Sequence, residues 1–292
     1  MEAAEIIRRG GLVAFPTETV YGLGANALDA AAVSRIYEAK GRPASSPLIV
    51  HVANREMARS IAAEWPPLAD QLAEHFWPGP LTLIVKKSLA IPDVVTAGLD
   101  SVGIRVPSHP LALELIRHAG VPIAAPSANR FMQISPTTAE HVRKGLGDRV
   151  DAILDGGPTT VGIESTVVSL LREPPAVLRL GMISLAQLQE ATGVRFELPA
   201  MEQGSSESPG LHPRHYAPRT PLYLLAPGQA HPPGRGKILD LPPNPAECAA
   251  ILYSSLHNAD SEGWEWLAVE NPPEGAEWAA IRDRLQRAAT TL

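Results

Sequence analysis

The amino-acid sequence predicts an α/β protein of two domains, and three observations support this prediction. Short apolar runs typical of strands alternate with amphipathic stretches typical of helices over residues 1–198. After Leu198 the sequence is rich in Gly, Ser, Pro and His and has no periodicity, as linkers are, and the α/β pattern then resumes. With 292 residues, 45% of them hydrophobic, the chain is long enough for two cores. We therefore expect a domain over 1–198, a linker or lid over 199–219 and a short second domain over 220–292.

The first domain is expected to contain one large twisted sheet with helices between its strands. Asp29 and Asn54 are candidate N-caps, and Pro110 suits the first turn of a helix that continues to His118. Ser184 opens the last helix of this domain. The expected strands are 12–15, 48–52, 81–85, 102–106, 121–125, 152–154, 166–169 and 176–178.

The second domain repeats the alternation on a smaller scale. Its expected strands are 222–225, 237–241 and 266–269. Its expected helices are 246–256 and 276–289.

Composition limits the classes of function that the chain can have. A formal net charge of −6 argues against a broad basic surface that wraps nucleic acid, so any cations that bind an anion must be local. No apolar run approaches the length of a transmembrane helix, and the first residues are acidic where a secretory signal is basic. The single cysteine, Cys248, cannot form an intramolecular disulfide. We expect a cytoplasmic protein without membrane association.

Two sequence patterns suggest nucleotide binding, and the first of them is unconvincing. The segment 22–27 matches a dinucleotide fingerprint, but six residues separate Phe15 from Gly22, whereas that fingerprint places its glycines directly in the turn after a strand. A Walker A loop and a nucleophile elbow are both absent.

The second pattern is Lys40-Gly41-Arg42-Pro43 at the end of a predicted helix. It is consistent with C-terminal cations that match the helix dipole, followed by a glycine stop. It is equally consistent with a phosphate clamp, in which an ammonium and a guanidinium on a short turn face a polyanion. Taken alone, the segment leaves both interpretations open.

Several other polar segments leave or enter apolar strands. Open α/β sheets place their ligands at strand ends, so the accumulation of hydroxyl, amide and arginine groups there indicates a site. The segments are 16–22, 124–129, 135–137, 162–166 and 178–181.

Taken in order, these segments resemble the threonylcarbamoyl-AMP synthases of the Sua5/YrdC family, in the two-domain Sua5 form. The resemblance covers nearly the whole chain. It rests on PTETVYGLGANAL (16–28), KGRP (40–43), PLIVHV (47–52), WPGPLTLIV (77–85), PIAAPSAN (122–129), SPT (135–137), ESTVV (164–168), LRLG (178–181), and SPG and HYAP in the linker.

The resemblance implies a fold and a reaction. The fold is a YrdC-like twisted open mixed sheet with flanking helices, followed by a small α/β Sua5 domain. The enzyme joins L-threonine, bicarbonate and ATP into threonylcarbamoyl-adenylate and releases pyrophosphate. The product serves downstream tRNA threonylcarbamoyl-transfer machinery, which modifies adenosine at tRNA position 37. Mg²⁺ is expected from ATP chemistry alone, because no metal-ligand constellation is evident.

The resemblance also assigns roles to individual residues. Lys40 and Arg42 are the expected catalytic cations. They are also expected at the end of an exposed helix, where replacement by Ala would leave the fold intact. The expected ATP contacts are Lys40, Arg42, Ser46, Ser101, Ser127, Asn129, Ser135, Arg179, His215 and Tyr216. The expected L-threonine contacts are Thr19, His51, Arg105 and Ser165, of which Arg105 suits the carboxylate.

The sequence departs from the family pattern at a few positions. Ser46 stands where Asn is usual, Ser101 where Thr is usual, and Leu180 where Pro is common. The segment 130–134 lacks the small residues usual there. None of these changes removes a charged group from the expected site, so we expect activity.

Two other functions compete with this one. The first is another carbamoyl-adenylate-forming enzyme of the same fold, but such relatives carry further domains, some with many cysteines. The second is an RNA-binding or ribosome-associated module, which the net charge of −6 disfavours although a local tRNA contact is compatible with it. An enzyme requires both threonine and bicarbonate for pyrophosphate release, whereas an RNA-binding module shows a steep salt dependence instead.

Overall fold

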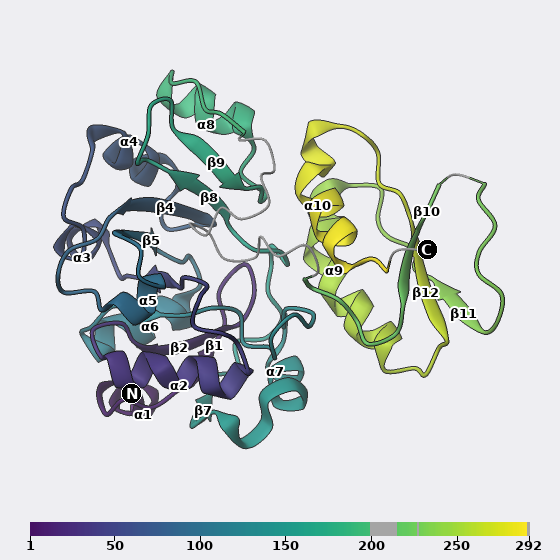
Figure 1. Cartoon of the computed structure of the whole chain (residues 1–292), viewed down its shortest axis with the longest axis horizontal. Coiled ribbons are helices and arrows are strands. Elements are labelled where there is room, and N and C mark those ends of the chain that lie inside the picture. Colours follow the sequence, from purple (N-terminus) through teal and green to yellow (C-terminus); the bar gives the residue numbers. More distant parts are fainter. Residues whose placement is uncertain (199–214, 227, 291–292) are drawn as a thin grey trace.

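The computed structural model describes residues 1–198, 215–226 and 228–290, and these form two sheets with their helices (Figure 1). The larger is a nine-stranded mixed sheet with the order β7-β1-β2-β6-β3-β5-β4-β8-β9. The smaller has three strands in the order β10-β12-β11, all parallel. The predicted fold class, one large mixed sheet followed by a small α/β domain, is confirmed.

Every strand predicted for the large sheet is present, with ends that differ by up to two residues from the prediction. One further strand, β2, was not predicted, and it lies within the segment that resembles a dinucleotide fingerprint. The strands are β1 (Val13–Phe15), β2 (Gly22–Asn26), β3 (Ile49–His51), β4 (Leu81–Lys86), β5 (Ser101–Arg105), β6 (Ile123–Ala124), β7 (Ala152–Ile153), β8 (Thr166–Ser169) and β9 (Ala176–Arg179).

The helix caps follow the predicted chemistry. The Asp29 side chain accepts hydrogen bonds from the backbone at the start of α2, and the Asn54 side chain does the same for α3. Ser184 forms a capping box at the start of α8. The helices of this part are α1 (Glu2–Arg8), α2 (Ala30–Lys40), α3 (Arg55–Ser60), α4 (Pro67–Phe76), α5 (Asp93–Thr96), α6 (Pro110–Ala119), α7 (Ala139–Leu146) and α8 (Leu185–Thr192). Of these, α1, α4, α5 and α7 were not predicted.

The C-terminal domain places its two long helices between its own sheet and the large sheet (Figure 1). Ile163, from the large domain, lies in the same hydrophobic cluster as Leu252 and Ile281 of these helices. The two domains therefore share a core at their boundary. The elements are β10 (Leu222–Leu225), β11 (Gly236–Ile238), α9 (Pro245–Asp260), β12 (Trp266–Glu270) and α10 (Ala279–Ala288), with short 3₁₀ turns at Gly147–Arg149 and Ala276–Trp278.

Most of the predicted linker, including its SPG segment, lies outside the described residues. Its last part, from His215 onward, runs between the two domains. Ala217 donates its backbone N–H to the carbonyl of Met132, which fixes this part of the linker against the large domain. No helix among the described residues has the length and apolar character needed to cross a membrane.

Candidate active site

One cavity lies against a face of the large sheet and gathers most of the predicted site residues. Ile49 and His51 are two residues apart on β3 and both line the cavity, so they project from the same face of the strand. The predicted residues that line it are Thr19, Lys40, Arg42, His51, Arg105, Ser127, Asn129, Ser165, Arg179, His215 and Tyr216.

The register of the sheet explains how distant segments meet here. β3 and β5 are parallel, and their pairing sets His51 directly beside Arg105. β8 and β9 are antiparallel, with Val167 opposite Arg179, which brings Arg179 close to Ser165, the residue before β8. His51, Arg105 and Arg179 are each the last residue of their strand, so these polar groups lie at strand ends, where open α/β sheets place their ligands.

Lys40 is buried, which contradicts the prediction of an exposed helix end. It is the last residue of α2, only 4% of its surface is exposed, and Gly41 follows with a left-handed φ of 63°. Its Nζ donates to the carbonyl oxygens of Ser127 and Asn129, at 2.5 and 2.6 Å. Because Lys40 is the last residue of α2, its ammonium lies beneath the loop 127–129 that follows β6. Burial and the neighbouring Arg42 hold the pKa of Lys40 well below its usual range.

Arg42 is held by Ser46, one of the residues that depart from the family pattern. Its Nη2 donates to the Ser46 hydroxyl at 2.6 Å and to the Ser46 carbonyl at 3.2 Å. Its buried Nε has no hydrogen-bond partner within the described residues. A buried donor without a partner is uncommon and suits a site that awaits a ligand. Ser46 itself does not line the cavity, so its visible role is to position Arg42.

Arg105 forms a buried ion pair beneath the cavity. Its Nη2 lies 2.7 Å from Oε1 of Glu18, its Nη1 donates to Thr19 Oγ1 at 3.0 Å, and its Nε donates to the Gly79 carbonyl. A guanidinium has five N–H donors, and the hydrogen bonds to Thr19 and Gly79 use two of them. Nη2 meets Glu18 as an ion pair but makes no aligned hydrogen bond within the described residues, so donors on both terminal nitrogens remain for a ligand. That geometry suits a bidentate contact with a carboxylate.

Arg179 and Ser165 form a second buried polar pair. The Nε of Arg179 donates to the Ser165 carbonyl and its Nη2 to the Ser165 hydroxyl, both at 3.0 Å. That hydroxyl is also 2.8 Å from the hydroxyl of Thr82 on β4. Both side chains are therefore fixed before any substrate arrives.

His51 is neutral in this environment. Burial first and the charge of Arg105 second lower its pKa to about 3. Its Nδ1 has no hydrogen-bond partner within the described residues. A neutral imidazole here can offer a hydrogen bond to a substrate but cannot act as a cationic phosphate ligand.

Glu164 lines the cavity and was missed as a site residue, although it opens the ESTVV segment. Its Oε1 accepts from the Ser135 hydroxyl at 2.7 Å. Its Oε2 accepts from Tyr253 and Arg284, which belong to the C-terminal domain. The sequence carried no signal for this role, because the partners lie about a hundred residues away. Thr17, Phe131 and Met132 also line the cavity without having been predicted.

Two predicted ATP contacts besides Ser46 lie outside the cavity lining. Ser135 is fully buried and supports Glu164 from behind. Ser101 is the first residue of β5 whereas Arg105 is the last, so the two lie at opposite ends of the strand. At ~3.3 Å per residue, that is roughly 13 Å along the sheet. The structure does not bring Ser101 to the other site residues.

His215 and Tyr216 close the cavity from the linker side. Tyr216 is 1% exposed and has a left-handed φ of 62°, which is unusual for a residue other than glycine. With both side chains in place, the free volume inside is about 60 Å³. Ligand pockets generally span roughly 300–1,000 Å³. The cavity as it stands is therefore too small for a nucleotide, and His215 and Tyr216 are the lining residues that the linker contributes.

The described residues contain no cluster of three or more His, Cys, Asp or Glu side chains that could hold a metal. The two carboxylates nearest the site, Glu18 and Glu164, are both ion-paired with arginines. The residues present therefore do not form a metal site of their own. Mg²⁺ would have to be held by phosphate oxygens and water.

Comparison with known proteins identifies the family of the chain. Residues 5–181 match the family model Sua5/YciO/YrdC, described as telomere recombination, and residues 183–290 match the model of the threonylcarbamoyl-AMP synthase C-terminal domain. The chain is 41% identical to the threonylcarbamoyl-AMP synthase of Bacillus subtilis, over 99% of this chain and 92% of that protein. The chain belongs to the threonylcarbamoyl-AMP synthase family, in its two-domain Sua5 form.

Other members of the family agree in sequence and in fold. The threonylcarbamoyl-AMP synthase of Pyrococcus abyssi is 51% identical over 226 residues, which cover 76% of this chain and 66% of that protein. A crystal structure of P. abyssi Sua5 complexed with L-threonine superposes with a TM-score of 0.91 at 40% identity, covering 99% of this chain and 93% of that chain. The resemblance inferred from the motifs is thus confirmed over both domains.

Proposed function

We propose that the cavity binds ATP, L-threonine and bicarbonate and joins them into threonylcarbamoyl-AMP with release of pyrophosphate. The observation that carries this proposal is the convergence of four cationic side chains, from α2 and the following turn, β5 and β9, on one small closable cavity. These are Lys40, Arg42, Arg105 and Arg179. Membership of the family and the L-threonine complex of P. abyssi Sua5 support the choice of substrates.

The site divides into two halves with different tasks. Lys40, Arg42 and Arg179 face the phosphates and neutralise the charge that develops when pyrophosphate leaves. Arg105 receives the threonine carboxylate on the remaining N–H donors of its terminal nitrogens, with Thr19, His51 and Ser165 around the rest of the amino acid. Ser127 and Asn129 border the nucleotide. Ser46 and Ser135 do not touch the substrates but hydrogen-bond to Arg42 and Glu164, respectively, and hold them in place.

The reaction requires that the substrates are held in position and that water is excluded from the site, and it does not require a covalent nucleophile. The threonine amine attacks the carbon of bicarbonate, and a carbamate forms as water leaves. A carbamate oxygen then attacks the α-phosphate and breaks its bond to pyrophosphate. A carbamate decays in water, so the attack must follow while the lid is closed. Mg²⁺ neutralises phosphate charge when it accompanies ATP, and no step here depends on a protein ligand for it. The cytoplasmic location and a weak tRNA contact remain predictions from the sequence.

Omitting one substrate at a time from a pyrophosphate-release assay tests the proposed function. We expect release only when ATP, L-threonine and bicarbonate are all present, because the carbamate is the nucleophile. ATP turnover that is independent of threonine would contradict the proposal and favour a related enzyme that forms another carbamoyl-adenylate. No turnover at all, combined with RNA affinity that falls steeply with salt, would favour the RNA-binding alternative.

The lid role of Tyr216 gives a separate prediction. Tyr216→Ala is expected to raise the number of ATP molecules consumed per threonylcarbamoyl-AMP released, since water then reaches the adenylate and hydrolyses it to AMP. The measurement is the ratio of AMP-containing products, resolved by chromatography. Tyr216→Phe keeps the buried ring and is the matched control, with an unchanged ratio. An unchanged ratio in Tyr216→Ala would refute a water-excluding lid.

A further inference from the structure

Two side chains of the C-terminal domain reach the wall of the cavity. Arg284 on α10 is 1% exposed, and its Nε lies 2.9 Å from Oε2 of Glu164. The Tyr253 hydroxyl on α9 donates to the same oxygen at 3.0 Å. Glu164 lines the cavity, so both side chains of the second domain touch the cavity wall at this carboxylate.

The contact depends on close backbone packing. Gly162, two residues before Glu164, has a φ of 81°, and a Cβ placed there would lie 2.2 Å from the carbonyl oxygen of Ala249 on α9. Only glycine allows this approach. Ile163 is fully buried in the cluster formed by the C-terminal helices. The segment that carries Glu164 is therefore built against the second domain.

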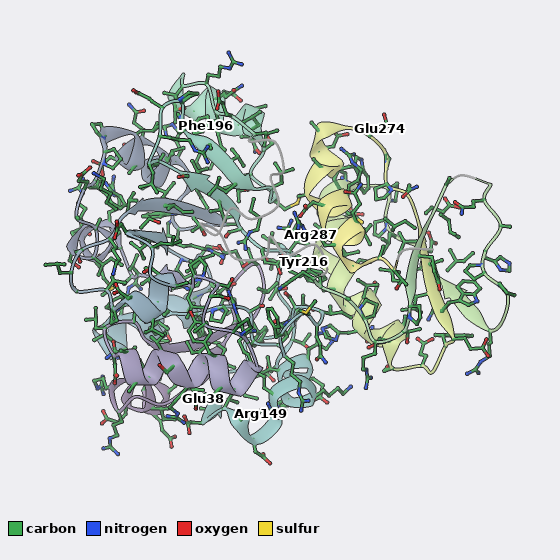
Figure 2. All side chains as sticks on the ribbon, in the orientation of Figure 1. Glu38, Arg149, Phe196, Tyr216, Glu274 and Arg287 are labelled. Atoms are coloured by element: carbon green, nitrogen blue, oxygen red, sulfur yellow. The ribbon has the colours of Figure 1, made fainter. Side chains whose placement is uncertain are left out.

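The same arginine also holds the lid. The guanidinium carbon of Arg284 lies 5.4 Å from the centre of the Tyr216 ring, within cation–π range. Tyr216 stacks on Tyr253 with ring centres 5.7 Å apart, and the backbone N–H of His215 donates to the Arg287 carbonyl. Figure 2 shows Tyr216 next to Arg287 of α10, on the side of that helix that faces the large domain. The Arg284 side chain thus both holds the lid residue Tyr216 and pairs with Glu164.

The charge on Glu164 matters because phosphates are to bind beside it. An unpaired carboxylate in the wall would repel ATP and attract Arg179, whose charge already influences Glu164. Pairing with Arg284 offsets the negative charge of the carboxylate beside the expected phosphate position. Asp283 and the Leu180 carbonyl occupy the other nitrogens of Arg284, which fixes its orientation toward Glu164.

We propose that Arg284 of the C-terminal domain is a positioning residue for nucleotide binding, because it neutralises Glu164 in the cavity wall while it holds the lid residue Tyr216. This inference rests on the proposed function of the cavity. It assigns the second domain a direct part in the active site, beyond covering the large sheet.

The test uses the full-length chain and three variants: Arg284→Met, Glu164→Gln and the double variant. ATP affinity is measured by calorimetry, and KM for ATP and kcat from pyrophosphate release. Arg284→Met is expected to weaken ATP binding at least tenfold, because Glu164 stays charged beside the phosphates. The double variant is expected to bind ATP within about threefold of Glu164→Gln, since the repelling charge is gone. Thermal unfolding of all variants verifies that they are folded, and the uncharged double variant keeps the test valid where Arg284→Met is unstable.

The pH profile separates this role from a merely structural one. Burial raises the pKa of Glu164, but Arg284 and Arg179 outweigh it, so the pKa lies below its usual value and the group stays ionised. In Arg284→Met the raising effect of burial on the pKa of Glu164 is opposed by Arg179 and the Ser135 hydrogen bond without Arg284, so it gains weight. The hydroxyls of Tyr253 and Tyr216 stay neutral at these pH values. ATP affinity of this variant should therefore recover as the pH falls through the raised pKa, whereas the wild type shows no such recovery.

Arg282→Met is the matched control, because Arg282 lies on the same helix and, within the described part of the chain, bonds only to backbone of its own domain, at Gly275 and Pro273. It should leave ATP affinity unchanged. The inference is overturned if Arg284→Met binds ATP as the wild type does, or if its loss is neither restored in the double variant nor relieved at low pH. A failure of the proposed function would differ, because the wild type itself would then lack threonine-dependent turnover.

Discussion

Lys40→Met is expected to reduce threonine-dependent pyrophosphate release by about 10²–10³-fold, the usual effect of removing one preorganised charge from a site that stabilises developing anions. The ammonium is held at the carbonyls of Ser127 and Asn129, both of which line the cavity, so its position is set before ATP arrives. Methionine keeps the length of the side chain and removes only the charge and the donors. The reaction rate is measured at saturating threonine and bicarbonate.

The same substitution is also expected to destabilise the fold, unlike the prediction from the sequence. The buried carbonyl oxygen of Asn129 and the part-buried one of Ser127 lose their donor, which costs roughly 1–3 kcal/mol of unfolding free energy. Urea denaturation measures this loss. Lys144→Met is the control, because Lys144 is exposed on α7 and its only described ion pair, with Glu140, is long at 3.8 Å. Near-normal turnover in Lys40→Met would contradict the phosphate clamp and favour the interpretation of residues 40–43 as a simple helix terminus.

The example of Lys40 shows where prediction from the sequence stops. The helix, its Asp29 cap and its glycine end follow from local rules, and all were predicted. Whether the lysine points to solvent depends on the loop at 127–129, which lies almost ninety residues further along the chain. Local patterns carry no information about that contact, and only the resemblance brought the two segments together.

Strand β2 was missed for a related reason. Its glycines lower strand propensity and resemble a phosphate-binding loop. In the fold, a Cβ at Gly24 would lie 2.7 Å from Ile123 and 2.8 Å from Phe15, so the glycine serves close packing between three strands. The packing partner on β6 is far away in sequence. The glycine pattern is thus structural, as the rejection of the dinucleotide interpretation implied.

The site residues predicted by resemblance mostly converge, but the resemblance could not rank them by distance from the ligand. Ser46 and Ser135 carry hydroxyls that act on Arg42 and Glu164 and do not line the cavity. Ser101 lies at the far end of β5 from Arg105. Glu164 was missed although it lines the cavity. Its position in the cavity wall depends on Arg284, whose packing no local pattern encodes.

Arg105→Met is expected to abolish L-threonine binding and to destabilise the protein by roughly 3–5 kcal/mol, because Glu18 is then left as a buried charge without its partner. Glu18 and Arg105 are 5% and 3% exposed, so water cannot compensate the carboxylate. Calorimetry with L-threonine measures binding, and urea denaturation measures stability. The same substitution at Arg143, whose ion pairs are half-exposed, should change stability by less than about 0.5 kcal/mol.

A double variant, Arg105→Met with Glu18→Gln, separates the two effects of Arg105. Stability should largely return, because the unpaired buried charge is gone, but L-threonine binding should remain absent. The reason is that the free N–H donors on Nη1 and Nη2 belong to Arg105 alone, and no change at Glu18 replaces them. If the double variant regained threonine binding along with its stability, Arg105 would be a scaffold for the PTET segment and the carboxylate would bind elsewhere in the cavity.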